Sequence, residues 1–378
     1  MSTSLLPRTL HPLAWWAWAL GLAAAAAQTT NPLLLLALVG VVGCVVLARR
    51  GDAPYARAFR WYLLAGLLVV VIRVVFRLLL GGGGVGSAGD PVLLPLPGVD
   101  LQWPGAPTLL GPLTSSALLA SVSEGLRLAT MLVCVGAANA LADPRRLLKS
   151  MPPALHEVGA AAVVAVSVLP QLAESTARVR AARRLRGGGG GRRNRLRAVV
   201  VPVLEDAVDR SLALAASMDA RGYGRRAAVP SHIRTLVAGL LMGGLIGLLV
   251  GVYALLDTST PRWLGLPMLA AGVAAAVGGL TLAGRRVERT RYRPDRWAPP
   301  EICAVLAGVV VAVTFLVTSD VAPLVTAPVV SPPSWPTLSL LPLLGLLAAL
   351  APALLTPPPP GSVPHRLGPP LVRARVPA

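Results

Sequence analysis

The sequence has few charged residues, few aromatic residues and only three cysteines. Charged residues make up 13% of the 378 residues, against about a quarter in ordinary soluble domains, and hydrophobic residues make up 54%. This balance excludes an ordinary soluble domain and favours a protein whose solvent is largely lipid. Aromatic residues amount to 4%, which leaves few rings for bases to stack on, so the net charge of +19 does not indicate nucleic-acid binding.

Residues for metal or nucleotide chemistry are also missing in the spacing that such sites need. Cys44, Cys134 and Cys303 lie singly within apolar segments, and the four histidines are equally scattered, so neither a disulfide nor a metal site is predicted. The glycine runs at 81–84 and 187–191 do not continue into the Gly-Lys-Ser/Thr of a P-loop. We interpret them as flexible linkers, and we expect any ATP to be hydrolysed by a partner.

Long apolar segments predict an all-α, polytopic transmembrane bundle of about eight spans. The first segment has the look of the hydrophobic region of a signal peptide, but the break at Asn31-Pro32 favours a tight turn between two short helices. The predicted spans are Leu13–Ala27, Pro32–Leu47, Trp61–Leu80, Thr114–Ala142, Thr235–Leu256, Leu264–Ala283, Ile302–Thr318 and Leu338–Leu355.

Arginine on alternate loops predicts the orientation, because cytoplasmic loops retain Lys and Arg. Positive charge gathers at 49–60, 145–149, 285–296 and 366–375, and is absent from 81–113 and 320–337. Eight spans in an inner or plasma membrane, with both termini cytoplasmic, satisfy this distribution. The predicted parts are N-terminal membrane helices (1–142), a cytoplasmic helical region (143–234), a membrane helix pair (235–284), a basic loop (285–300), an additional helix pair (301–356) and a Pro-rich cytoplasmic tail (357–378).

The cytoplasmic region 143–234 is predicted to contain two long helices. Its apolar stretch Val158–Leu172 is too short to span, so we expect it in the membrane interface or against other helices. The helical pattern continues through Pro170 as a basic helix, and a second helix follows from about Ala198 to Arg221. Asp206 and Arg210 are an i,i+4 pair on this second helix. One apolar face of the second helix should be buried, and it contains Val201, Leu204, Val208, Leu212 and Ala215.

Both helices end alike, in Leu185-Arg186-Gly187 and in Ala220-Arg221-Gly222. Glycine just past the last turn supplies a left-handed cap, so each arginine should lie at an exposed helix tip. A single arginine of this kind is typical of a favourable interaction with the helix dipole. Two matching tips within one region favour paired binding partners instead.

The run Ala215-Ala216-Ser217-Met218-Asp219-Ala220-Arg221-Gly222-Tyr223-Gly224 resembles the second Ala-Arg-Gly motif of the T component of energy-coupling factor transporters, a group that includes the cobalt-transport permeases. Arg184-Leu185-Arg186-Gly187 falls where this family has its first motif, with Leu185 in place of alanine. The resemblance covers roughly residues 10–285 and includes His11-Pro12-Leu13, Asn31-Pro32-Leu33-Leu34 and Leu155-His156-Glu157-Val158.

The resemblance implies a non-enzymatic coupling subunit of an ATP-driven importer for a vitamin or a transition-metal ion. Such a subunit sits between two cytoplasmic ABC-type ATPases, which bind the ATP, and a small substrate-binding membrane protein. Arg221 and Arg186 would contact the ATPases, Ala220 would permit close approach, and Gly187 and Gly222 would end the coupling helices; Asp219 belongs to the same motif. The substrate is left open, because selectivity resides in the other membrane subunit.

Arg73, Arg77 and Glu124 are charged residues inside the third and fourth predicted spans, in the outer half of the bilayer. We interpret them as a structural ion pair between the two helices, with a role in substrate passage as the alternative. Two other functions stay open for the whole chain: a membrane-embedded enzyme acting on a lipid or prenyl substrate, and a membrane scaffold whose basic segment binds anionic lipid. The spans contain no arrangement of catalytic residues that would favour the enzyme.

Overall fold

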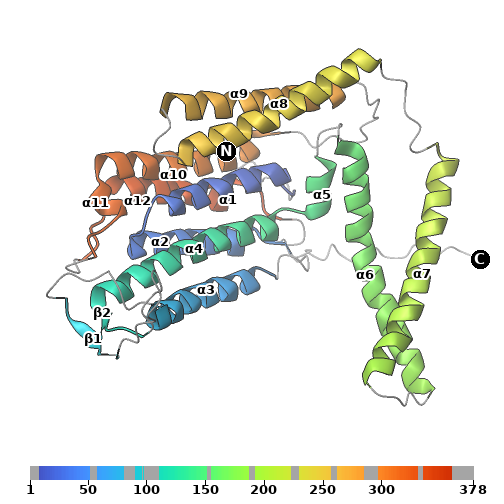
Figure 1. Cartoon of the computed structure of the whole chain (residues 1–378), viewed down its shortest axis with the longest axis horizontal. Coiled ribbons are helices and arrows are strands. Elements are labelled where there is room, and N and C mark those ends of the chain that lie inside the picture. The colour runs from blue at the N-terminus through green and yellow to red at the C-terminus, as the bar shows by residue number, and fades with distance from the viewer. Residues whose placement is uncertain are drawn as a thin grey trace, which may run out of the picture. The chain divides into compact units, whose positions relative to one another are not determined.

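The structure is a computed structural model of the chain, and it describes residues 8–51, 58–80, 90–95, 97, 110–150, 155–186, 192–222, 230–256, 262–284, 297–330 and 335–359. The predicted all-α class is confirmed, with one short two-stranded hairpin among the described residues (Figure 1). The chain divides into two compact units, residues 1–147 with 294–378, and residues 148–293.

Among the described residues, seven helices are long and apolar enough to cross a membrane. Six of them match predicted spans: α2 (Pro32–Arg49), α3 (Phe59–Leu80), α4 (Ser115–Leu141), α8 (Ser231–Leu256), α9 (Arg262–Gly284) and α10 (Pro299–Val321). The seventh is α6 (His156–Leu185), in which the expected apolar and basic stretches form one continuous helix through Pro170. The predicted first and last spans are the 16-residue helices α1 (Pro12–Ala27) and α12 (Leu340–Leu355).

The N-terminal ends of α1 and α2 are determined by residues within the first turn. Each has proline at its first position, where the missing N–H is not needed, and a polar residue just before it. His11 Nδ1 accepts a hydrogen bond from the Leu13 N–H at 3.3 Å, and Asn31 Oδ1 accepts one from the Leu33 N–H at 3.0 Å. The predicted turn at Asn31-Pro32 therefore also caps α2.

The first unit has its core between α1, α2, α4, α10 and α12. The large buried side chains include Trp18, Leu22 and Phe315. A Cβ on Gly21 of α1 would lie 2.8 Å from the Gly308 Cα of α10, so the two backbones approach more closely than any side chain would allow. In Figure 1 the helices α1, α2, α4, α10 and α12 lie side by side.

Hydrogen bonds connect the C-terminal helices to the N-terminal ones across almost the whole sequence. The Trp18 indole N–H donates to the Ala349 carbonyl at 3.2 Å, and Asn31 Nδ2 donates to the Val325 carbonyl at 2.8 Å, at the short helix α11 (Pro323–Thr326). Arg8 Nη2 pairs with Glu301, which is 1% exposed, at 2.6 Å. These contacts build α10 and α12 into the same unit as α1 and α2.

The helices α3 and α4 pack together and are joined by a segment that includes the antiparallel strands β1 (Val92–Leu94) and β2 (Leu113–Thr114). Gly125 of α4 lets α3 approach closely, since a Cβ there would be 3.1 Å from the Val70 Cα. The short helix α5 (Pro144–Lys149) follows α4. Arg146 of α5 contacts Thr9 near the N-terminus.

The second unit contains two helix pairs. The hairpin of α8 and α9 packs through small residues, among them Gly247 and Gly272. The other pair is α6 with α7 (Arg192–Ala220), and it contains both predicted Arg-Gly ends.

Candidate functional site on the helix pair α6 and α7

Helices α6 and α7 run in opposite directions and cross each other (Figure 1). Ser175 of α6 contacts Asp206 of α7 at the crossing. Toward the start of α6 and the end of α7, both helices line one groove, from Leu172 and Ser211 near the crossing to Ala160 and Met218 at its far end. The C-terminal end of α6 therefore points away from the C-terminal end of α7.

The C-terminal end of α6 is exposed. The helix ends at Leu185, and the Arg186 N–H closes the last turn by donating to the carbonyls of Ala182 and Arg183, each at 3.2 Å. Leu185 is 89% exposed, and the Arg186 side chain is also exposed. The predicted cap Gly187 lies outside the described residues.

The C-terminal end of α7 has the predicted left-handed cap. Gly222 has φ +71°, and its N–H donates to the Asp219 carbonyl at 2.8 Å. The Arg221 N–H donates to the Met218 carbonyl at 3.1 Å, which tightens the last turn. Asp219, Ala220 and Arg221 are all exposed. The backbone thus stops at Gly222 and leaves the Arg221 guanidinium available to a binding partner.

The two arginines lie on opposite sides of the crossing. Arg186 is eleven residues beyond Ser175 along α6, roughly 16 Å at the rise of an α-helix. Arg221 is fifteen residues beyond Asp206 along α7, roughly 22 Å in the other direction. One surface on a partner could reach both ends only by extending along the whole helix pair.

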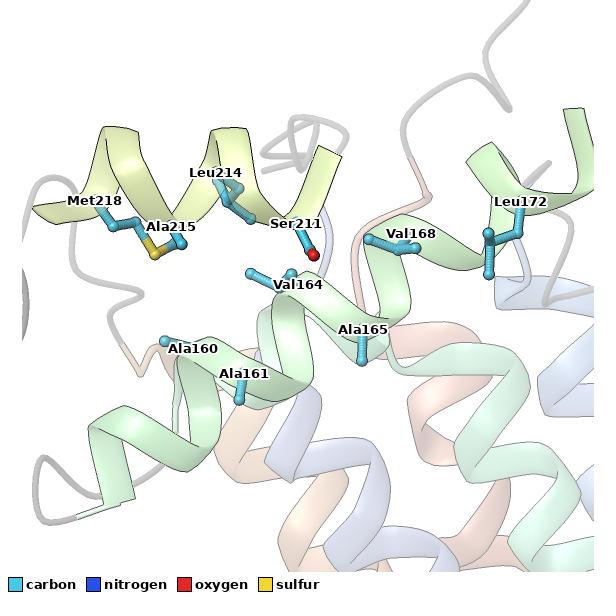
Figure 2. Close-up of a pocket in the computed structure, with 10 residues that line it drawn as sticks. All are labelled: Ala160, Ala161, Val164, Ala165, Val168, Leu172, Ser211, Leu214, Ala215 and Met218. Carbon is cyan, nitrogen blue, oxygen red and sulfur yellow. The ribbon is translucent and has the colours of Figure 1, made fainter. Parts of the chain in front are cut away.

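The groove between α6 and α7 is apolar. Its volume is about 640 Å³, and Figure 2 shows Val164 and Val168 of α6 facing Ser211 and Leu214 of α7. The Ser211 hydroxyl is already satisfied within its own helix, since it donates to the Val208 carbonyl at 2.8 Å. The groove therefore offers apolar contact rather than polar recognition.

The apolar face predicted to be buried on α7 is mostly uncovered by the described part of the chain. Val201, Leu204, Val208 and Leu212 are between 43% and 63% exposed. Only Ala215 of this face lines the groove against α6. Helix α6 packs on the adjacent face, so the apolar stripe of Val201, Leu204, Val208 and Leu212 is left for another surface.

Asp206 joins three side chains at the crossing. Its carboxylate accepts hydrogen bonds from the Ser175 hydroxyl at 2.7 Å and from Arg210 Nε at 3.0 Å, and Arg178 lies 3.7 Å away. The Ser175 hydrogen bond, helped by the two arginines, holds the pKa of Asp206 below its ordinary value. The pair Asp206–Arg210 was predicted from its spacing; Ser175 was not, because nothing local connects it to a residue 31 positions later.

Two of the three charged residues predicted to lie inside the membrane are in contact. Arg73 of α3 forms an ion pair with Glu124 of α4, and both side chains are about half exposed. Arg77 lies one turn further along α3 and is half-buried. Arg127, on the next turn of α4, donates instead to the Ala27 carbonyl at the end of α1. Among the described residues, no group of three His, Cys, Asp or Glu side chains is placed to hold a metal ion.

Comparison with known families places the chain in a family of membrane transport proteins. The model of the cobalt transport protein family, CbiQ, matches residues 4–231, which is more than half of the chain. The chain belongs to the cobalt transport protein family. Comparison with individually curated proteins finds no match.

Membership of the CbiQ family confirms the resemblance drawn from the sequence motifs and makes the chain a multi-pass membrane protein of a transport system. The match includes both Arg-Gly ends and stops as α8 begins. Helices α10 and α12 lie beyond it, although they pack against α1 and α2, which lie within it.

Proposed function

We propose that this CbiQ-family chain is the transmembrane coupling subunit of an energy-coupling factor importer, carrying a vitamin or a transition-metal ion. It receives motion from two cytoplasmic ABC-type ATPases, which bind the ATP, and passes the motion to a small substrate-binding membrane subunit. Both termini lie in the cytoplasm, and the chain itself holds no cofactor. The observation that carries the proposal is the pair of exposed arginines, Arg186 and Arg221, at helix ends on opposite sides of one crossing.

The spacing of the two ends supports two separate partners. Because Arg186 and Arg221 lie roughly 16 Å and 22 Å from the crossing in opposite directions, each end suits its own binding groove. A pair of like ATPase subunits presents two equivalent grooves, as pairs of identical chains related by a two-fold axis do. Closing of the ATPase pair would then move both ends of the helix pair at once.

The chemistry of each end supports insertion into an acidic groove. Arginine presents a planar fork of donors that fits a carboxylate with two hydrogen bonds, and it stays charged when it leaves water. Ala220 beside Arg221 adds no bulk, whereas Leu185 beside Arg186 is large and 89% exposed. The α7 end is therefore the tighter contact, and the α6 end needs a groove with an apolar wall for Leu185.

The exposed apolar stripe on α7 supports a further membrane partner. Val201, Leu204, Val208 and Leu212 are exposed apolar residues at helical spacing along α7. Burying such a surface contributes about 25 cal/mol per Å² of apolar area. This stripe is the surface that we assign to the substrate-binding subunit.

Co-purification with ATPase subunits tests the proposal. The chain is co-expressed with P-loop ATPases encoded beside it, and Arg221→Glu and Arg186→Glu are compared singly and together. We expect Arg221→Glu to weaken ATPase binding by about 2 kcal/mol or more, roughly thirtyfold, as for a buried arginine at an interface centre. The double variant should lose both ATPases.

A matched control distinguishes the effect of changing the two helix-end arginines from the effect of losing positive charge in general. Arg180→Glu changes an exposed arginine of α6 that lies six residues, roughly 9 Å, before Arg186. This variant should bind ATPases as the unchanged chain does. Retention of both ATPases by the double variant would disprove the assigned role of the tips.

A further inference from the structure

The crossing of α6 and α7 is held by a polar contact at a single carboxylate. The Ser175 hydroxyl, on a residue that is 3% exposed, donates to Asp206 Oδ2 at 2.7 Å. Arg210, on the same helix as Asp206, donates to the other oxygen at 3.0 Å, and Arg178 of α6 lies 3.7 Å from Oδ2. Asp206 thus receives contacts from both helices at once.

The surroundings of this contact differ on its two sides. On one side, toward Arg221, the helices are separated by the apolar groove of about 640 Å³. On the other side, α6 becomes a basic helix that ends at Leu185. Loose apolar packing along the groove does not fix one angle between two helices, whereas a directional hydrogen bond from the buried Ser175 hydroxyl does.

We propose that Asp206 is a positioning residue that fixes the crossing of α6 and α7 and thereby the spacing of the two Arg-Gly ends. The proposal rests on the proposed function insofar as these ends contact the ATPases. Asp206 does not touch an ATPase or a substrate in this view. It acts through Ser175 and Arg178 of α6, which it joins to α7.

The geometry makes the tips sensitive to the crossing angle. A rotation of about 10° around Asp206 would move Arg221, roughly 22 Å away, by about 4 Å. That displacement is larger than a hydrogen-bond length, so Arg221 would leave a groove that it otherwise fits. The contact at Asp206 therefore determines whether both ends can be engaged at once.

Distance measurement on the full chain tests the positioning role without any ATPase. Spin labels are attached at Leu185→Cys and Ala220→Cys, in a background with the native cysteines replaced, and the chain is placed in lipid nanodiscs. With Asp206 present we expect one narrow distance distribution. Asp206→Ala should reduce the population of that distance about tenfold, the change expected from losing a charge-assisted hydrogen bond.

Three further variants keep the test decisive if Asp206→Ala folds poorly. Asp206→Asn keeps the size and should broaden the distribution less, because the amide oxygen still accepts from Ser175. Ser175→Ala should broaden it as Asp206→Ala does, and Ser175→Thr, which restores a hydroxyl, should recover the narrow peak. Asp209→Asn, at an exposed neighbouring carboxylate, is the control and should change nothing.

Assays of the assembled transporter separate this inference from the proposed function. Asp206→Ala leaves both arginines in place but should reduce the fraction of chains that hold both ATPases at once and lower uptake, whereas Arg221→Glu should lose the ATPase at the α7 end alone. If the unchanged chain binds no ATPase, the proposed function fails while the distance result stands. An unaltered distance distribution in both Asp206→Ala and Ser175→Ala would overturn the positioning role.

Discussion

Replacing Gly222 tests whether the cap of α7 presents Arg221 to a partner. Gly222 has φ +71°, a conformation that glycine adopts freely, and its N–H closes the helix on the Asp219 carbonyl at 2.8 Å. The left-handed conformation costs an L-residue with a Cβ about 1–2 kcal/mol, and it costs asparagine less. Valine is branched at Cβ and fits this region worst.

A graded series follows from these energies. If the cap must form for Arg221 to enter its groove, a cost of about 1–2 kcal/mol lowers the capped population roughly 5–30-fold. Affinity for the ATPase should therefore fall in the order Gly, Asn, Ala, Val at position 222, although Arg221 itself is unchanged. The measurement is a titration of the purified chain in nanodiscs with the ATPase subunit.

Two checks make the Gly222 series specific. Gly243→Ala changes a glycine of α8 at which a Cβ would meet nothing within 4 Å, and it should leave ATPase affinity unchanged. Gly222→Asn should bind more tightly than Gly222→Ala even though its side chain is larger. Equal affinity for Gly222→Val and the unchanged chain, at matched expression, would refute the reasoning.

Three further predictions concern other parts of the molecule. Gly21→Val should markedly lower the melting temperature in detergent, because a Cβ at Gly21 collides with α10, whereas Gly40→Ala, where nothing lies within 4 Å, should not. Glu124→Gln should lower the yield of folded protein and leave transport per folded molecule unchanged. Exchanging Glu124 and Arg73 should restore the yield. Reduced transport at normal yield would contradict the structural role of this ion pair. Because the pKa of Asp206 is lowered, its carboxylate stabilises the crossing of α6 and α7 fully at pH values above the ordinary aspartate pKa. This stabilisation is lost as the pH falls through the lower pKa that Asp206 has in the folded chain. The distance between the two Arg-Gly ends should therefore stay constant across neutral pH, and its distribution should broaden only in acid.

The positions of several helix ends could be predicted from short stretches of sequence. Asn31-Pro32 predicted a turn, and the structure has Asn31 capping α2. Gly222 was predicted to carry a left-handed cap, and it does. Caps depend on residues within one turn of each other, so a single stretch of sequence contains all the information that they need.

The length and continuity of the membrane helices followed only partly. Among the described residues, hydropathy located six of the seven helices long and apolar enough to span a membrane. The helical pattern also predicted that α6 continues through Pro170, and it does, but the apolar stretch Val158–Leu172 was judged too short to span. The basic residues that follow this stretch lengthen the helix to 30 residues, which the apolar stretch by itself does not indicate.

Contacts between distant segments could not be read from the sequence. The burial of Glu301 against Arg8, and the place of α10 and α12 beside α1, join residues almost 300 positions apart. The apolar pattern of α7 indicated one face to bury, yet α6 covers the adjacent face. Periodicity shows that a helix has an apolar face, but the shape of its neighbour decides which face is packed.

By itself the sequence determined that this chain is a membrane protein of helices, and where two of those helices stop with an arginine at the end. Composition and helix caps do not depend on how the helices are arranged relative to one another. Only the tertiary structure decided that the matching ends lie on opposite sides of a crossing and that Ser175 meets Asp206 there. The physical reason is that the direction and pairing of two helices depend on contacts between residues far apart in the chain.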